Sequence, residues 1–147
     1  MSDYANICLS SCRKVVVERN YMYGFYRTRF TEQIPEQLNG CISYDDWTIT
    51  IKSINKLFEE LEKPTSKSFL LTALTILTCT IGSILSKIDS DRRKKKILDF
   101  IYRQNEKIFH KAGFHIDNPF ECGLRMIQIS VLSTGKFVDR IKSHNYE

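Results

Sequence analysis

One stretch of the chain constrains its fold more than any other, because no charged residue occurs between Ser68 and Ser86. A membrane-spanning helix needs about 20 predominantly apolar residues, so this stretch is slightly short for one. Its four threonines, three serines and one glycine also dilute its hydropathy. We therefore rank a helix embedded in the plane of a membrane first, a buried core helix second and a spanning helix third.

Two stripes at helical spacing are superposed on this stretch. The small residues lie on one of them: Ser68, Thr72, Thr75, Cys79, Gly82 and Ser86. A two-residue offset rotates by about 200° around a helix, which places the large apolar residues on nearly the opposite face. Small residues let a neighbouring helix approach closely, and large apolar ones enter the acyl boundary of a bilayer. The predicted membrane-facing residues of this stripe are Leu70, Leu74, Leu77, Ile81 and Ile84.

A basic run, Arg92–Lys96, follows shortly after the uncharged stretch. A polybasic segment beside an apolar helix suits anionic lipid headgroups. We predict that Arg93, Lys94 and Lys95 face such headgroups. An ordinary solvated helix face or a nuclear-localisation-like run is the alternative.

The chain has 147 residues, of which 42% are hydrophobic and 27% charged, which indicates one folded domain. The sequence predicts the α+β class, with a small antiparallel sheet covered by about three helices, one of them strongly apolar. The sheet is expected to combine an N-terminal hairpin with a C-terminal strand. We place the domain at residues 14–132, between flexible tails at 1–13 and 133–147.

Periodicity predicts the individual elements. The hairpin is expected to pair the run Val15–Val17 with a strand over residues 26–30. Ser43 is a candidate N-cap for a first helix that ends at Pro64. A further helix is predicted to begin at the N-cap candidates of residues 89–91 and to stop at Gly113. Alternating residues from Arg125 to Val131 predict the final strand.

The chain carries little that resembles catalytic machinery. Its five cysteines are scattered, which favours free thiols in a reducing compartment. The three histidines lack metal-ligand spacing, and phosphate-binding and nucleophile motifs are missing. His115 and Asp117 are read as a polar loop and not as an acid/base pair. We therefore expect no enzymatic activity, no metal and no cofactor.

The most specific motif block lies in the C-terminal half. It comprises Tyr102–Phe109, then Gly113-Phe114, Asp117–Pro119 and Gly123–Ile127. With the hairpin and the first helix, this block resembles the golgin subfamily A member 7 family, which includes the accessory subunit of the yeast Ras palmitoyltransferase. The resemblance covers about Val15 to Val131. Its candidate partner or structural residues are Asn105, Pro119, Gly123 and Arg125.

The resemblance implies a non-catalytic accessory subunit. Family members stabilise a multi-pass Asp-His-His-Cys palmitoyltransferase whose clients include Ras-type proteins. They reside on the cytosolic face of the Golgi, the endoplasmic reticulum or the plasma membrane. Some are palmitoylated on cysteines of the middle helix, but Ala73 and Ile76 stand at the matching positions here. Cys79, one turn further on, is the remaining candidate for lipid attachment, and a small buried residue is the alternative reading.

Two other functions compete with this one. The first is a trafficking adaptor or golgin-binding protein at the membrane with no role in acyl transfer. The second is a nucleic-acid-binding module that uses Arg27, Arg29 and Arg92–Lys96. The aromatic residues near them would form its stacking platform: Tyr23, Phe25, Tyr26 and Phe30. Core packing explains these aromatic residues more simply, so we expect partners of protein and lipid and no nucleic acid.

Overall fold

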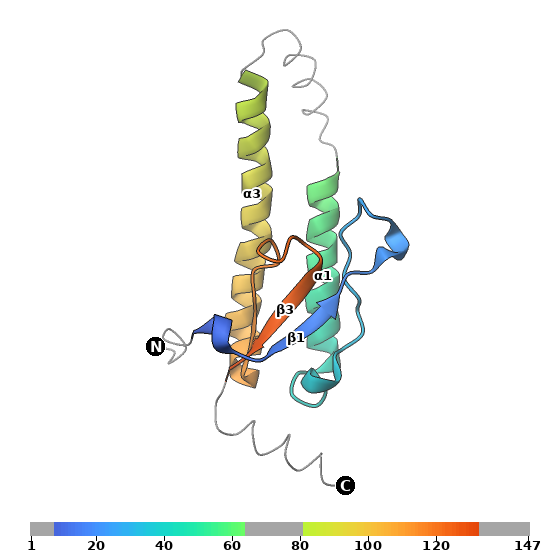
Figure 1. The fold of residues 1–147 in the computed structure, drawn as a ribbon, viewed down its shortest axis with the longest axis vertical. Helices are drawn as coiled ribbons and strands as arrows, with labels where there is room; N and C mark the ends of the chain where they lie inside the picture. Colours follow the sequence, from blue (N-terminus) through green and yellow to red (C-terminus); the bar gives the residue numbers. More distant parts are fainter. Residues whose placement is uncertain (1–7, 64–80, 133–147) are drawn as a thin grey trace.

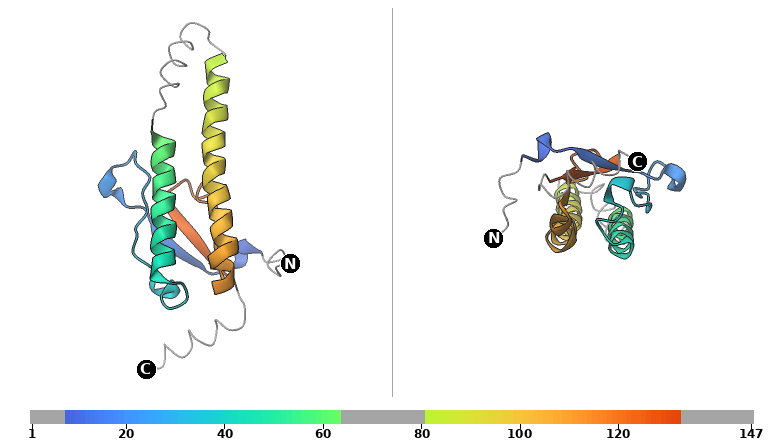
Figure 2. Two further views of the ribbon diagram at one scale, coloured as in Figure 1. Left: turned by 180° about the vertical axis from the view of Figure 1, so that it is seen from behind. Right: turned by 90° about the horizontal axis from the view of Figure 1, so that it is seen from below.

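The computed structural model describes residues 8–63 and 81–132, and of residues 81–89 it describes the backbone alone. Within these residues the strands β1 (Lys14–Glu18), β2 (Phe114–Ile116) and β3 (Met126–Val131) form one antiparallel sheet in the order β1-β3-β2. The described helices are α1 (Tyr44–Glu62) and α3 (Ile81–Gln104). Both helices cover the same face of the sheet, side by side (Figures 1 and 2). The predicted α+β class is confirmed.

The core fills the space between the sheet and the two helices. Strand alternation turns one face of the sheet inward, and that face supplies Val15, Val17, Phe114, Ile116, Ile127 and Ile129. Helical periodicity supplies the opposing buried side chains: Trp47, Ile51, Ile54, Phe58, Ile97, Ile101 and Phe109. Burial of these side chains is the main force that holds the two layers together.

Two details of the predicted sheet are wrong. Residues 26–30 do not form a strand and contact β1 through a single bridge between Arg19 and Phe30. β3 instead pairs directly with β1, with Val17 opposite Ile127. The third strand is the short β2, whose Ile116 lies opposite Ile129.

The predicted helix boundaries are correct at some ends and wrong at others. α1 begins after Ser43 and ends before Pro64, as expected, although the Ser43 side chain makes no capping hydrogen bond in the described part of the chain. A helix start at residues 89–91 is wrong, because α3 runs through them without a break. The expected stop at Gly113 is confirmed by its left-handed φ of 83°. A π-helical turn over Asn105–Phe109 follows α3 and was not predicted.

Asn105, inside that π-helical turn, closes one edge of the sheet. Its side-chain nitrogen donates to the carbonyl of Ile116 at 2.9 Å, and its side-chain oxygen accepts from the Ile116 N–H at 2.8 Å. The amide thus reproduces the two hydrogen bonds that a neighbouring strand would make to β2. Asn105 is only 2% exposed, so these buried groups depend on one another.

Asn55 of α1 makes the same kind of two hydrogen bonds to the backbone of Phe30, at the opposite side of the sheet. Its side chain accepts from the Phe30 N–H at 2.8 Å and donates to the Phe30 carbonyl at 3.0 Å. The residues on either side of Phe30 bind the end of β1 and the residues after it. The Thr31 N–H donates to the carbonyl of Glu18, and the Asn20 N–H donates to the carbonyl of Arg29. The pairing ends at this bridge because the chain turns at Asn20, whose side chain caps the short helical turn Tyr21–Tyr23, so residues 26–30 add no regular strand.

We predict that Asn105→Ala lowers the free energy of unfolding by about 2–4 kcal/mol, because it leaves a buried N–H and a buried C=O unpaired. Asn55→Ala should cost less, about 1 kcal/mol, because that site is partly exposed. Urea unfolding monitored by circular dichroism measures both. The exposed Asn39 provides the control, since Asn39→Ala should change stability by less than about 0.5 kcal/mol. Equal effects at all three asparagines would contradict this account.

Candidate functional site

The motif block from Tyr102 to Ile127 folds as one continuous unit. It runs through the end of α3, the π-helical turn, β2 and a tight turn into β3. The predicted motif residues serve different roles within it. Asn105 is the buried clamp described above, and Pro119 is buried in the turn, whereas Gly123 and Arg125 are exposed.

The turn between β2 and β3 is held by its own backbone. Asn118 accepts from the Phe120 N–H through its side chain at 3.0 Å. The Leu124 N–H donates to the carbonyl of Pro119. Gly123 has a φ of 61°, which favours glycine, and a Cβ there would meet nothing within 4 Å. The backbone conformation at this position, and not the close approach of another atom, is therefore what suits a glycine.

A polar cluster covers the outer face of the sheet. The Asp117 carboxylate pairs with the Lys14 ammonium at 2.5 Å and accepts from the Ser130 hydroxyl at 2.7 Å. Ser130 is fully buried, so this hydroxyl is closed to a substrate. The cluster ties β1, β3 and the turn after β2 together. These contacts use both carboxylate oxygens of Asp117 for structure, which agrees with the reading of this residue as a polar loop residue.

The side chain of His115 forms a hydrogen bond with a second histidine, His110. Its Nδ1 lies 2.8 Å from Nε2 of His110, so one ring donates a hydrogen bond to the other. Burial lowers the pKa of His115, and the nearby His110 lowers it further. Glu106 lies on the other side of His110, with 3.3 Å between its Oε1 and Nδ1 of that ring.

The predicted membrane-facing residues fall into three groups. Leu70, Leu74 and Leu77 lie outside the described residues, as does Cys79, the candidate for lipid attachment, while Ile81 and Ile84 belong to the first turns of α3. In the basic run, Lys94 and Lys95 are exposed. Arg93 instead reaches across to α1 and donates to the carbonyls of Glu60 and Lys63 at 3.3 and 3.2 Å. It therefore binds carbonyls at the end of a neighbouring helix, a role that sequence reasoning missed.

The described helices give no support for a spanning segment. Among residues 8–63 and 81–132, none is both long and apolar enough to cross a bilayer. Most of the uncharged stretch over residues 68–86, to which the ranking of in-plane, buried and spanning helices applies, lies outside the described residues.

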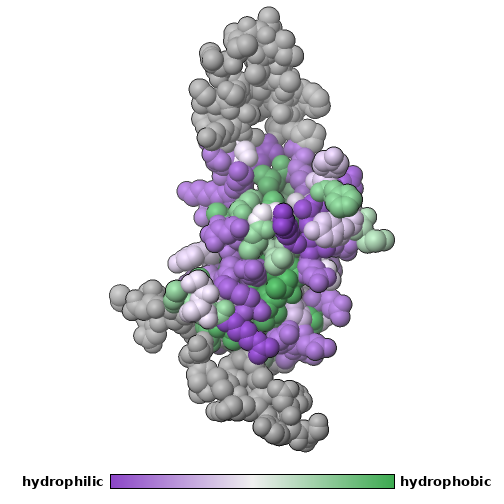
Figure 3. Space-filling model, viewed as in Figure 1, coloured by the Kyte–Doolittle hydropathy of each residue, from purple (hydrophilic) through white to green (hydrophobic). Residues whose placement is uncertain are grey.

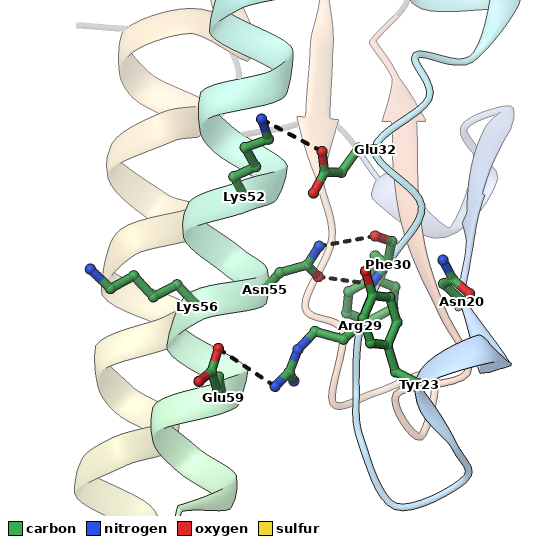
Figure 4. A pocket seen from close by; sticks show the side chains of 9 residues that line it. All are labelled: Asn20, Tyr23, Arg29, Phe30, Glu32, Lys52, Asn55, Lys56 and Glu59. Atoms are coloured by element: carbon green, nitrogen blue, oxygen red, sulfur yellow. Dashed lines mark hydrogen bonds and ion pairs between the residues drawn. The ribbon is translucent and has the colours of Figure 1, made fainter.

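A shallow groove of about 640 Å³ lies between α1 and the segment over residues 20–32 (Figure 4). Its charged side chains face one another across it: Lys52 lies 3.8 Å from Glu32, and Arg29 lies 3.9 Å from Glu59. Arg29 also pairs with Glu62 at 3.0 Å. These ion pairs hold the 20–32 segment against α1. They also engage Arg29, so it is not available as a nucleic-acid contact.

The most exposed apolar feature was not recognised from the sequence. Residues 21–26, here called the aromatic loop, leave β1 and project beyond α1 (Figures 1 and 2). Tyr23, Phe25 and Tyr26 were expected in the core but are 56%, 81% and 97% exposed, while Phe30 alone of that group is buried. The clustering of aromatic residues around Gly24 was the available signal.

The family of the chain follows from comparison with known proteins. The model of the golgin subfamily A member 7/ERF4 family matches residues 14–128, from the start of β1 into β3. The chain belongs to this family. The predicted resemblance is thereby confirmed, and the family is not a known catalytic one.

Curated members of the golgin subfamily A member 7/ERF4 family are similar over most of their length. Golgin subfamily A member 7 of Gallus gallus is 33% identical over 118 residues, covering 80% of this chain and 85% of that protein. The Homo sapiens protein of the same name is 31% identical over the same shares. Golgin subfamily A member 7B of Mus musculus is 30% identical, covering 83% of this chain and 72% of that protein.

The histidine pair predicts a pH-dependent stability. Because the pKa of His115 is lowered in the folded chain, the unfolded chain binds its proton more readily. Stability should therefore fall as the pH drops below about 6.5, the ordinary pKa of histidine, toward the lower folded value. His115→Gln should flatten this loss in urea unfolding measured from about pH 7.5 to about pH 5. Parallel pH profiles for the two proteins would rule out this role of His115.

Proposed function

We propose that this chain is a non-catalytic accessory subunit of a protein S-palmitoyltransferase. It would bind and stabilise a multi-pass Asp-His-His-Cys enzyme on the cytosolic face of the Golgi, the endoplasmic reticulum or the plasma membrane. The observation that carries the proposal is membership of the golgin subfamily A member 7/ERF4 family over residues 14–128. The clients of the complex would include Ras-type proteins.

The contacts of the polar side chains support a structural role over a catalytic one. The polar groups that resemble catalytic ones make contacts within the fold: Asp117 with Lys14 and Ser130, and His115 with His110. In the described part of the chain, no three His, Cys, Asp or Glu side chains are grouped to hold a metal ion. The acyl-transfer nucleophile would then belong to the partner enzyme.

The motif block offers a surface for that partner. Tyr102 on α3 is 65% exposed although it is a large aromatic residue, and Arg103 next to it is exposed as well. Arg125 is exposed at the start of β3. Exposed aromatic and arginine side chains are typical anchors of protein–protein interfaces. We therefore assign Arg125 to the partner contact, with the buried Asn105 keeping the block in shape.

Co-purification tests the proposal. The tagged chain is co-expressed with an Asp-His-His-Cys palmitoyltransferase and purified in mild detergent, and the enzyme and its hydroxylamine-sensitive acyl label are measured in the eluate. We expect recovery of the acylated enzyme with the wild-type chain. Arg125→Glu should reduce recovery, whereas Arg13→Glu, an exposed arginine just outside the matched residues, should not.

Two outcomes would contradict the proposal. One is that no transferase is recovered and that depletion of the chain leaves the enzyme as stable as before. The other is normal acylation of Ras-type clients in depleted cells together with recovery of a golgin, which would identify a trafficking adaptor.

A further inference from the structure

The aromatic loop presents large apolar side chains to solvent with almost nothing covering them. Met22, Phe25 and Tyr26 are 93%, 81% and 97% exposed, and Tyr21 and Tyr23 are each about half exposed. The space-filling view shows apolar side chains gathered where this loop projects (Figure 3). Exposed apolar patches on a folded domain mark contact surfaces.

Hydrogen bonds hold the backbone of the aromatic loop, so its side chains project from a fixed backbone before anything binds. Arg19 at the end of β1 donates to the carbonyls of Phe25 at 2.6 Å and Arg27 at 3.2 Å. Its guanidinium also lies 5.4 Å from the centre of the Tyr21 ring. The side chain of Asn20 accepts from the Met22 N–H at 3.0 Å and caps the turn. A surface built in this way loses little conformational entropy when it is buried.

The charge of the segment selects among possible partners. Residues 19–31 contain three arginines and no aspartate or glutamate. Arg27 is exposed directly after the aromatic loop. Arg29 pairs with Glu59 and Glu62 and Arg19 binds loop carbonyls, so Arg27 is the arginine of this segment that is open to an anionic group. Apolar side chains beside an exposed arginine are complementary to a surface with negative charge outside and hydrocarbon beneath, as in an anionic bilayer.

We infer that the aromatic loop inserts into the headgroup region of an anionic bilayer. Tyrosine is enriched at this depth, because its ring is apolar and its hydroxyl is polar. Side chains that stand clear of the fold enter a deformable lipid phase without matching pockets, which a rigid protein partner would have to supply. The inference rests on the membrane-surface part of the proposed function and adds a contact site made only of described residues.

A tryptophan reporter tests the inference on the full chain. Phe25→Trp places an indole on the loop, and the only native tryptophan, Trp47, is fully buried and serves as an internal blank. Unilamellar vesicles of phosphatidylcholine and phosphatidylserine are added, with and without brominated acyl chains as quenchers. Ile49→Trp on α1 is the matched control, because Ile49 is 62% exposed on another element.

We expect the emission of Phe25→Trp to shift to shorter wavelength on these vesicles and to lose intensity with the brominated lipid. Ile49→Trp should behave like the wild-type chain. The combined variant Met22→Ser, Phe25→Ser and Tyr26→Ser should keep the wild-type circular dichroism spectrum and bind vesicles more weakly in sedimentation.

Three results would overturn the inference. The first is an unchanged Phe25→Trp emission on vesicles that the chain does bind, which leaves the proposed function standing. The second is a shift that appears only when a palmitoyltransferase is added, which makes the loop a protein contact. The third is a shift with single-stranded RNA and none with vesicles, which makes it a stacking platform. A chain that binds no vesicles at all would remove the membrane part of the proposed function as well.

Discussion

Two asparagine side chains, one from α1 and one from the π-helical turn after α3, hold the backbone at the two sides of the sheet. Asn105 satisfies both backbone groups of Ile116, and Asn55 satisfies both of Phe30. An exposed strand edge invites pairing with another chain, and Asn105 blocks such pairing at Ile116 on the edge strand β2. The same bonds tie each helix to its side of the sheet. They therefore fix the spacing of the two layers that enclose the core.

This arrangement limits how the protein can recognise others. Backbone pairing at Ile116 would first require Asn105 to release its bonds, so this edge of the sheet favours recognition through side chains. The described candidates are the aromatic loop, the exposed part of the basic run and the exposed residues of the motif block. The lipid contact and the partner contact proposed above lie on separate surfaces, as an accessory subunit that holds an enzyme at a membrane would require. Its internal polar groups, among them Asp117 and His115, serve the fold.

Sequence reasoning worked where one periodic pattern decided the structure. The alternation of β3 and the apolar stripe of α1 predicted both elements, and Gly113 predicted the helix stop. It failed where a local turn or a distant side chain decided the outcome. Asn20 caps a turn over Tyr21–Tyr23 that ends the expected hairpin after one bridge, and Arg93 binds the end of α1 although its neighbours suggest a lipid contact. The aromatic loop was misread because apolar residues usually indicate a core, and local sequence does not reveal what covers them.

Native-state hydrogen exchange tests the central claim most directly, because it reads single backbone amides. If the asparagine clamps close the sheet, the amide protons of Phe30 and Ile116 exchange as slowly as those of the central strand β3, and only through global unfolding. Asn105→Ala, which removes the acceptor of the Ile116 N–H, should speed exchange at Ile116 while leaving Phe30 protected, because the two clamps lie on opposite sides of the sheet. Fast exchange at both amides in the wild-type chain, at rates typical of frayed loops, would contradict the account.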